Sequence, residues 1–365
     1  MVRTAPLPDR GVVQSLTSAE RTVKPVKWAA GFGVACVAFF AYLVIRWIAS
    51  GNFVPTSHGT DPVPGWMTAT AYGHELLSLV ILTTTGYFVV IRPIRRAHRL
   101  SWDGMLWFSC LAVYWQDLLS NYFRPYVLYT TAFHQWGSWF NFIPGYALPH
   151  ANRMGEPFVF SLGIYTWFLA GAAFGCFIMR QMKRRHPRLG PIGLMAICFI
   201  VVAIWDFTLE VAWLALGMYF YPAPIGPTVF AGTRFQFPIM EAVMAGIVAT
   251  AVAALRYFRD DQGRSVAERG IDSVRATPRQ KSALRTFAVI GAVNMIYLFT
   301  YQLPLVVIMG SSYVGNWNPY ILERSYLRNQ LCGEGTEYAC PSPKIPMPLP
   351  GSSHVDPHGT LVGPR

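Results

Sequence analysis

Six acidic residues lie within or at the ends of strongly apolar stretches of the sequence. Ionised side chains at membrane depth are costly, so they usually face a protein interior or a water-filled cavity. A group of acids at similar depth therefore indicates a site for proton transfer or for recognition of polar groups. The six residues are Glu75, Asp117, Glu156, Asp206, Glu210 and Glu241.

Asp206 and Glu210 are four residues apart in WDFTLE, a spacing that places both side chains on one face of a helix. Two carboxyl groups in a low-dielectric site cannot both ionise cheaply, so we expect one to hold a proton near neutral pH. Such a pair can act as general acid and general base. The alternative is a structural pair bonded to Arg, Tyr or Trp. We favour catalysis for this pair, and a structural role for Glu75, Glu156 and Glu241 near helix ends.

The sequence lacks the residues that several other kinds of membrane-protein chemistry require. No apolar stretch contains a Lys for a retinal-type Schiff base, and only His74 lies at the edge of one, too few for haem or a multi-histidine iron site. The sequence has no phosphate loop, GxSxG motif or Cys/His zinc spacing. A divalent metal on Asp117, Asp206 and Glu210 is a less favoured alternative. We therefore expect neither metal nor cofactor.

The composition indicates which elements carry these acids. Hydrophobic residues make up 53% of the 365 residues and charged residues 13%, which is typical of a polytopic membrane protein of the cell membrane. Apolar stretches near the ~20 residues of a spanning helix predict an all-α bundle of about seven transmembrane helices. They are Trp28 to Ile48, His74 to Ile91, Gly104 to Asn121, Phe158 to Met179, Ile192 to Leu216, Pro238 to Tyr257 and Thr286 to Met309.

Basic residues are concentrated in alternate connections. The tail before Trp28 contains five Lys and Arg residues, and the connections 92–99, 180–188 and 256–285 contain four, five and eight. The intervening connections contain none, two and one. This pattern predicts a cytoplasmic N-terminus and an exterior C-terminus. It explains most of the net charge of +12, so we expect the lipid bilayer as a partner and no nucleic acid.

The predicted organisation is a basic tail (1–27), a transmembrane domain (28–310) and an exterior tail (311–365) rich in Pro and Gly. We expect the exterior tail to be extended or disordered toward its end. Its two cysteines, Cys332 and Cys340, could form a disulfide on an oxidising side, and free thiols are equally open. The exterior connection 122–157 is aromatic and nearly chargeless, so it predicts either a lid over the bundle or an aromatic interfacial belt.

In this topology the acids converge on one outward-facing pocket. Asp206, Glu210 and Asp117 are the predicted catalytic residues. Positively charged or ionisable partners available on the same side are Arg46, Arg124, Arg153, Arg234, His74, His134 and His150. Predicted substrate-binding residues are Asn121, Tyr122, Arg124, Trp139, Glu156, Trp205, Tyr219 and Tyr221.

Four segments resemble the AveC-like spirocyclases, a family of multi-span actinobacterial membrane proteins. They are QDLLSNYFRPY from Gln116, NFIPG from Asn141, GEP from Gly155 and DFTLEVAWLALGMYFYP from Asp206. The resemblance covers roughly Trp28 to Gly310. It implies closure of a spiroketal ring in a polyketide, in some members with dehydration, without metal or nucleotide. It supplies no catalytic list, so the site residues above rest on the sequence argument alone.

The combined hypothesis is a membrane-embedded acid/base cyclase that forms a spiroketal by dehydrative ring closure of a lipophilic polyketide-like substrate. One alternative is an integral-membrane terpenoid cyclase, which also needs an acid and aromatic faces. Another is a non-catalytic membrane protein that binds a lipid or a protein partner. A proton-coupled transporter is less favoured because the sequence has no evident internal repeat. Polyketides are made in the cytoplasm, so an outward pocket would require lateral access from the bilayer.

Overall fold

The computed structural model describes residues 25–311, 315–342, 344–345, 348 and 351–364. Within them, six helical segments are long and apolar enough to span a membrane, which confirms an all-α, multi-pass membrane protein. The N-terminal tail predicted for 1–27 lies largely outside the described residues. The six segments are α2 (Pro25–Ala49), α3 through α4 (Gly65–Ala97), α6 (Phe158–Arg185), α7 (Pro191–Ala215), α8 (Ile239–Tyr257) and α9 through α10 (Pro278–Met309).

Two of these segments contain a π-helical turn before a proline. In the first, α3 (Gly65–Gly86) and α4 (Arg92–Ala97) flank the turn Tyr87–Ile91. In the other, α9 (Pro278–Tyr297) and α10 (Leu303–Met309) flank the turn Leu298–Gln302. Proline cannot donate the usual backbone hydrogen bond, and a wider turn accommodates that loss within a continuous helix.

The third predicted span, Gly104 to Asn121, differs from the expectation. Its helix α5 is Trp102–Val113, and at ~1.5 Å per residue it is too short to cross a ~30 Å hydrocarbon core. The chain continues in two 3₁₀ turns, Tyr114–Gln116 and Leu119–Asn121, whose residues are all buried. Irregular backbone at membrane depth is tolerated where protein covers it. After Val113 the sequence YWQDLLSN mixes apolar and polar side chains, so hydropathy averaged over the whole segment does not locate the break.

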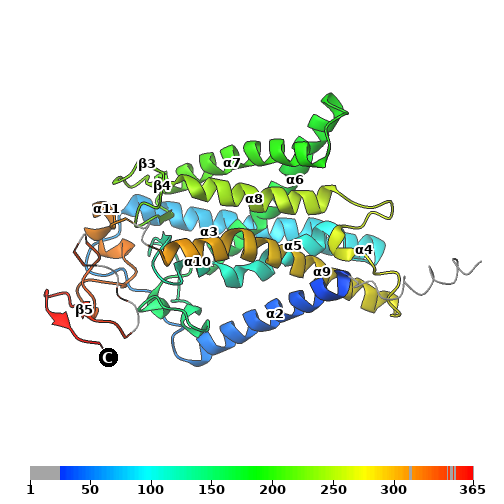
Figure 1. The fold of residues 1–365 in the computed structure, drawn as a ribbon. Helices are drawn as coiled ribbons and strands as arrows, with labels where there is room; N and C mark the ends of the chain where they lie inside the picture. The colour runs from blue at the N-terminus through cyan, green and yellow to red at the C-terminus, as the bar shows by residue number, and fades with distance from the viewer. Residues whose placement is uncertain (1–24, 312–314, 343, 346–347, 349–350, 365) are drawn as a thin grey trace, which may run out of the picture.

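The connections separate into two ends of the bundle. Figure 1 places α4, the start of α2 and the α6–α7 and α8–α9 connections at one end, with the short strands, α11 and the C-terminus at the other. We call the first the basic end, because it carries the Arg- and Lys-rich connections. The alternation of basic connections along the chain thus corresponds to one physical end. That this end faces the cytoplasm remains a prediction.

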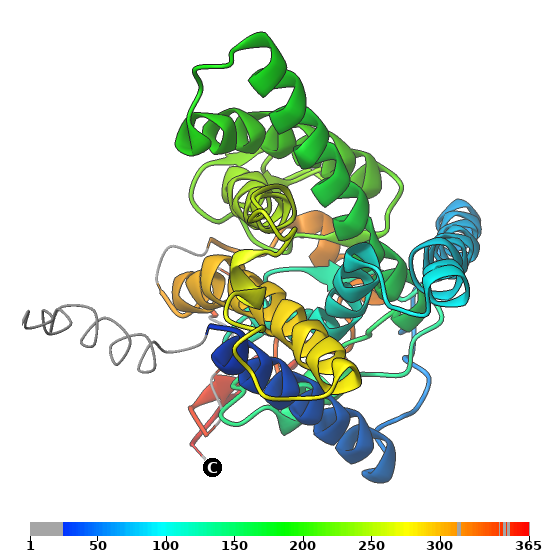
Figure 2. The ribbon, with the colours of Figure 1, turned by 90° about the vertical axis from the view of Figure 1, so that its right-hand side faces the viewer.

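Close helix packing depends on small residues between α2 and α9, which lie side by side in Figure 2. A Cβ added at Gly33 would lie 2.1 Å from the Phe287 carbonyl oxygen, and one at Gly291 would lie 1.9 Å from that of Ala29. Only glycine permits this approach. Small residues commonly allow such contact between membrane helices, where packing rather than hydrophobicity drives association.

Opposite the basic end, three segments fold together into a cap, which we define as residues 114–157, 216–238 and 315–342. Strands β1 (Leu128–Tyr129) and β2 (Tyr219–Phe220) pair antiparallel and join the first two segments. The cap also contains β3 (Thr228–Val229) paired with β4 (Phe237–Pro238), and α11 (Pro319–Leu322). The aromatic connection 122–157 therefore packs on the bundle through contacts such as Tyr126 with Glu241 and Tyr129 with Asp117, and its role as a lid stays a prediction.

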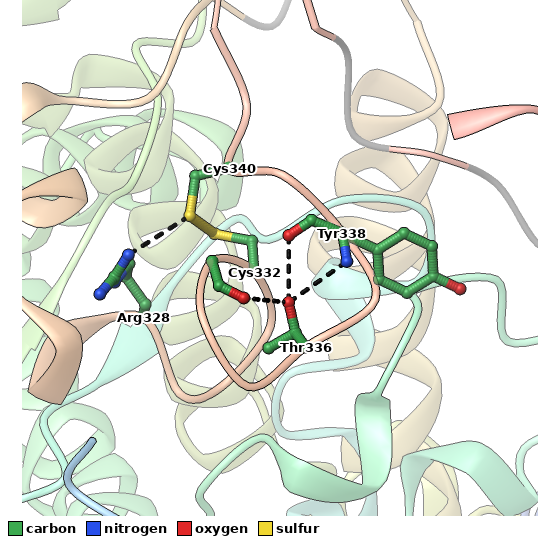
Figure 3. The surroundings of a disulfide bond; sticks show 6 residues. Arg328, Cys332, Thr336, Tyr338 and Cys340 are labelled. Carbon is green, nitrogen blue, oxygen red and sulfur yellow. Dashed lines mark hydrogen bonds between the residues drawn. A yellow bond between two sulfur atoms is a disulfide. The ribbon is translucent and has the colours of Figure 1, made fainter. Parts of the chain in front are cut away.

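Part of the C-terminal tail, residues 315–342, belongs to the cap and is held to its other segments by side-chain hydrogen bonds. Buried Asn329 donates to the Tyr129 carbonyl (2.9 Å) and accepts from the Gly155 amide (2.9 Å). A disulfide joins Cys332 and Cys340, and within the loop it closes Thr336 donates to the Tyr338 carbonyl (Figure 3). Beyond the cap, β5 (His354–Val355) pairs with β6 (Leu361–Val362).

Candidate functional site

A cavity of about 140 Å³ lies inside the bundle, between α6, α7, α8, α9 and the cap. Four of the six predicted acids line it, and most of the remaining lining is aromatic or aliphatic. The acids are Asp117, Asp206, Glu210 and Glu241, and the aromatic residues are Tyr126, Tyr129, Tyr165, Trp167, Phe168, Trp205, Trp213, Tyr219, Tyr221, Tyr297 and Tyr301.

The break after α5 directs Asp117 into the bundle. Asp117 has an extended backbone (ψ 145°) and is followed by Leu118 in the left-handed region (φ 48°). Its carboxylate accepts hydrogen bonds from the hydroxyls of Tyr129 (3.0 Å) and Tyr165 (3.0 Å). Tyr165 is also 3.2 Å from the Tyr297 hydroxyl. The end of this helix is thus used to place a carboxylate between two phenols.

Glu210 and Glu241 are held in the same manner by residues of the cap and of α9–α10. Glu210 accepts hydrogen bonds from Tyr219 and from Tyr221 (2.9 Å), both at or beside β2. Glu241, in the first turn of α8, accepts from Tyr126 and Tyr301 in the same way. Tyr301 lies in the π-helical turn Leu298–Gln302, and its bond to Glu241 is 2.6 Å long. Three carboxylates therefore each receive two phenol hydroxyls.

Asp206 differs from these three acids. Among the described residues no hydrogen bond reaches its carboxyl group, and its Oδ2 atom is buried without a partner. Buried polar atoms are nearly always satisfied, so an exception in a cavity wall needs an explanation. Because Asp206 also lines the cavity one helical turn from Glu210, a ligand or a water molecule in the cavity is the natural partner for this oxygen.

No Lys, Arg or His lines the cavity as the described residues define it. The predicted cationic partners lie elsewhere: Arg46 stacks on Phe142, Arg124 donates to the Ser311 carbonyl, and Arg234 stacks on Phe235. These arginines, available on the same side according to the sequence, do not contact the cavity acids. Burying a guanidinium would require its own desolvation, whereas phenols satisfy a carboxylate without added charge.

Of the three histidines available as partners, only His134 contacts an acid, and that acid lies outside the cavity. His134 contacts Glu75 at 2.7 Å and also donates its backbone amide to that carboxylate (2.8 Å), so Glu75 has a structural pairing outside the cavity. His74 bonds the Thr70 carbonyl, and His150 packs against Tyr338.

Glu156 lies outside the cavity lining, next to Asp117 and fully buried. Its Oε1 accepts from Tyr114 (2.9 Å) and Ser161 (2.9 Å), while Oε2 has no donor among the described residues. Burial, followed by the charge of Asp117, raises the pKa of Glu156 well above its usual range. Burial likewise raises the pKa of Asp117, against the lowering effect of its hydrogen bonds. These two neighbouring carboxyl groups can therefore share a proton.

The structure sorts the predicted site residues into two groups. Asp117, Asp206, Glu210, Trp205, Tyr219 and Tyr221 come together around the cavity, while Asn121, Tyr122, Arg124, Trp139 and Glu156 are not in its lining.

The residues outside the lining make contacts that shape the cap. Asn121 accepts from the amides of Tyr126 (2.7 Å) and Val127 (3.1 Å), Tyr122 donates to the Pro144 carbonyl (3.0 Å), and Trp139 is fully buried. The bonds of Asn121 fix the turn that delivers Tyr126 to Glu241.

Sequence reasoning gave Glu241 a structural role and did not select most of the tyrosines that bind the acids. The tyrosines that were not selected are Tyr126, Tyr129, Tyr165 and Tyr301, together with Tyr297, which contacts the Tyr165 hydroxyl. A signal was present, because Tyr126 and Tyr129 sit three apart in RPYVLY and Tyr297 and Tyr301 sit four apart, where one helical face carries both. In the described part of the chain, no three His, Cys, Asp or Glu side chains are placed to hold a metal ion.

The fold and this cavity define a multi-pass membrane protein with an internal pocket in which three of four carboxyl groups are bound by phenols. The sequence model of the family described as Spirocyclase AveC-like matches residues 95–326, and the chain belongs to that family. The match includes every residue that lines the cavity. Family membership indicates an enzyme that forms spiroketals. Comparison with curated proteins and with solved structures gave no match.

Proposed function

We propose that this protein closes a spiroketal by dehydrative cyclisation of a lipophilic, polyketide-like substrate in the carboxylate–tyrosine cavity. The observation that carries the proposal is the unpartnered carboxyl group of Asp206, which faces a cavity whose other three acids are held by phenols. A substrate hydroxyl can take the place that no side chain fills. The apolar remainder of the lining suits a lipophilic chain, which would reach it from the bilayer.

The proposed reaction begins with a proton on Asp206. This carboxylic acid donates its proton to the hydroxyl of a hemiketal carbon, the carbon–oxygen bond breaks, and water leaves. The resulting oxocarbenium ion is stabilised by the nearby carboxylates and by the faces of aromatic residues such as Trp205 and Trp213. The largely apolar lining of the cavity favours attack by a substrate hydroxyl over recapture of water.

The second half of the reaction closes the ring. A second hydroxyl of the substrate attacks the cation, and Glu210 accepts the proton that this hydroxyl loses. Return of the proton from Glu210 to Asp206, one turn away on α7, restores the starting state. Substrate and product differ by one water, and no net proton or electron is consumed. The chain's own side chains are sufficient for every step.

Terpenoid cyclisation is a second candidate, because the aromatic faces beside an acid would equally stabilise a carbocation formed from a polyene. The two reactions give different products. Terpenoid cyclisation yields an isomer of its substrate, whereas spiroketal formation yields a product lighter by one water.

The test compares lipophilic metabolites of the native host by mass spectrometry. The host has the gene deleted, restored, or restored as Asp206→Asn plus Glu210→Gln at equal membrane levels. We expect the deletion and the double variant to accumulate a compound heavier than the missing product by one water. Accumulation of an isomer would move the assignment to a terpenoid cyclase. An unchanged metabolite profile would refute both and favour a binding or transport role.

A further inference from the structure

A second pocket lies at the basic end of the bundle, away from the cavity. It carries three guanidinium groups and one carboxylate, a net excess of two positive charges. Aromatic side chains flank these groups, as is common where helices leave the hydrocarbon region. The lining residues are Ser101, Trp102, Asp103, Arg180, Arg256, Tyr257 and Arg259.

The three arginines differ in how much of their bonding capacity is used. Arg256 is engaged by Asp103 through two bonds of 2.8 and 2.9 Å. Arg259 donates only Nε, to the Arg256 carbonyl (2.9 Å), and its guanidinium lies 4.6 Å from the Trp102 ring centroid. Arg180 is exposed and makes no side-chain hydrogen bond or ion pair with the described residues. Arg180 and Arg259 therefore retain donors for an anion.

The electrostatics of the pocket also favour a bound anion. Burial, and then the charge of the neighbouring Arg256, lowers the pKa of Arg259, which lies beyond the end of α8. An anion bound between the arginines would offset that repulsion.

An apolar groove adjoins the pocket on the membrane side, and the two share Asp103 and Arg256 as a common wall. The groove is formed mainly by α3 and α6. Ala170 and Ala173 leave it open, since both are small and exposed. Its remaining lining residues are Ile81, Thr85, Thr166, Trp167 and Leu169.

We propose that this composite site binds an anionic phospholipid, with the headgroup phosphate at Arg180 and Arg259 and an acyl chain along the groove. Charge complementarity selects the headgroup, because basic pockets between helices at this level of a bilayer bind anionic lipids. The continuous apolar groove selects a lipid over a free phosphate ion. The site is separate from the cavity acids, so it does not depend on the proposed cyclase activity.

The test is native mass spectrometry of the full chain, purified in detergent and titrated with phosphatidylglycerol or with phosphatidylcholine. The variant Arg180→Gln plus Arg259→Gln leaves the Arg256–Asp103 pair intact. At about fivefold per basic residue, we expect its phosphatidylglycerol affinity to fall roughly thirtyfold. The control Arg184→Gln plus Arg188→Gln removes two charges from the same end but not from the pocket, and we expect retained binding.

Two further measurements separate a lipid from a free anion. Ala170→Phe would fill the groove without changing any charge, and we expect it to weaken phosphatidylglycerol binding. Inorganic phosphate should not displace the bound lipid. The proposal is overturned if the arginine variant binds as the control does, if phosphatidylcholine binds equally well, if Ala170→Phe leaves lipid affinity unchanged, or if inorganic phosphate competes.

Discussion

Replacing Asp206 with Asn tests the proposed general acid directly. The substitution keeps the size of the side chain, and because no hydrogen bond holds the Asp206 carboxyl group among the described residues, it breaks no observed contact. We therefore expect normal folding and membrane insertion. The amide cannot deliver a proton, and removal of a general acid typically lowers the rate ~10²–10⁴-fold. The expected result is a loss of kcat in that range.

The assay measures turnover in proteoliposomes, with the compound that accumulates in the deletion strain as substrate and mass spectrometry as the readout. Asp261→Asn is the matched control, because Asp261 is an exposed acid in the connection at the basic end. Its turnover should equal that of the parent chain. If Asp206→Asn, folded and inserted at the same level, turned over as fast as this control, Asp206 would not be the acid and the mechanism would fail.

Three further predictions concern Glu210, Glu156 and the packing of α2 on α9. The double variant Tyr219→Phe plus Tyr221→Phe removes both donors to the Glu210 carboxylate at ~1.5–3 kcal/mol for each charge-assisted bond, so kcat should fall at least tenfold; unchanged kinetics would argue against Glu210 as the base. Glu156, whose pKa is raised in the folded state, binds more protons folded than unfolded, so stability should fall as pH rises above its unfolded pKa of ~4.3. Thermal unfolding in detergent across pH 4 to 8 should show that slope in the parent chain and a flatter one in Glu156→Gln; parallel slopes would contradict it. Gly33→Ala should lower the unfolding temperature because its Cβ would clash with a carbonyl, whereas Gly31→Ala, with no atom within 4 Å, should not; equal effects would refute close packing of α2 on α9.

Much of the helical bundle could be predicted from composition and loop charge, because length and apolarity alone decide whether a segment can cross a bilayer. The exception, α5, shows the limit of that reasoning. Hydropathy averages over the segment and does not detect a backbone break inside a predicted span, even though the residues after Val113 include polar side chains. The break is set by tertiary contacts: Gln116 donates to Asn294 (2.9 Å) on α9, and Asp117 turns toward Tyr129 and Tyr165.

The acids themselves could be found from sequence because a carboxylate in an apolar stretch is rare, and four of the six do share the cavity. The tyrosines that bind these acids could not be predicted from the sequence in the same way. Tyr126 reaches Glu241 only because Asn121 fixes the turn before it, and Tyr219 is placed by the pairing of β1 with β2. The Tyr126–Glu241 contact and the pairing of β1 with β2 join segments far apart in the chain, so the local sequence does not specify them.

Phenols, and not cations, bind three of the four cavity acids, and this difference affects the chemistry that the cavity can support. An arginine beside each acid would hold it ionised and would leave no proton to donate. A tyrosine hydroxyl orients a carboxyl group and can bond either its neutral or its charged form, so protons can remain in the cavity and move between neighbouring acids. Asp206 and Glu210 on one helical face, with Glu241 beside them, are arranged for that exchange. An anion-binding site or a salt-bridge network would need the opposite composition, which is why the lining itself favours acid/base chemistry.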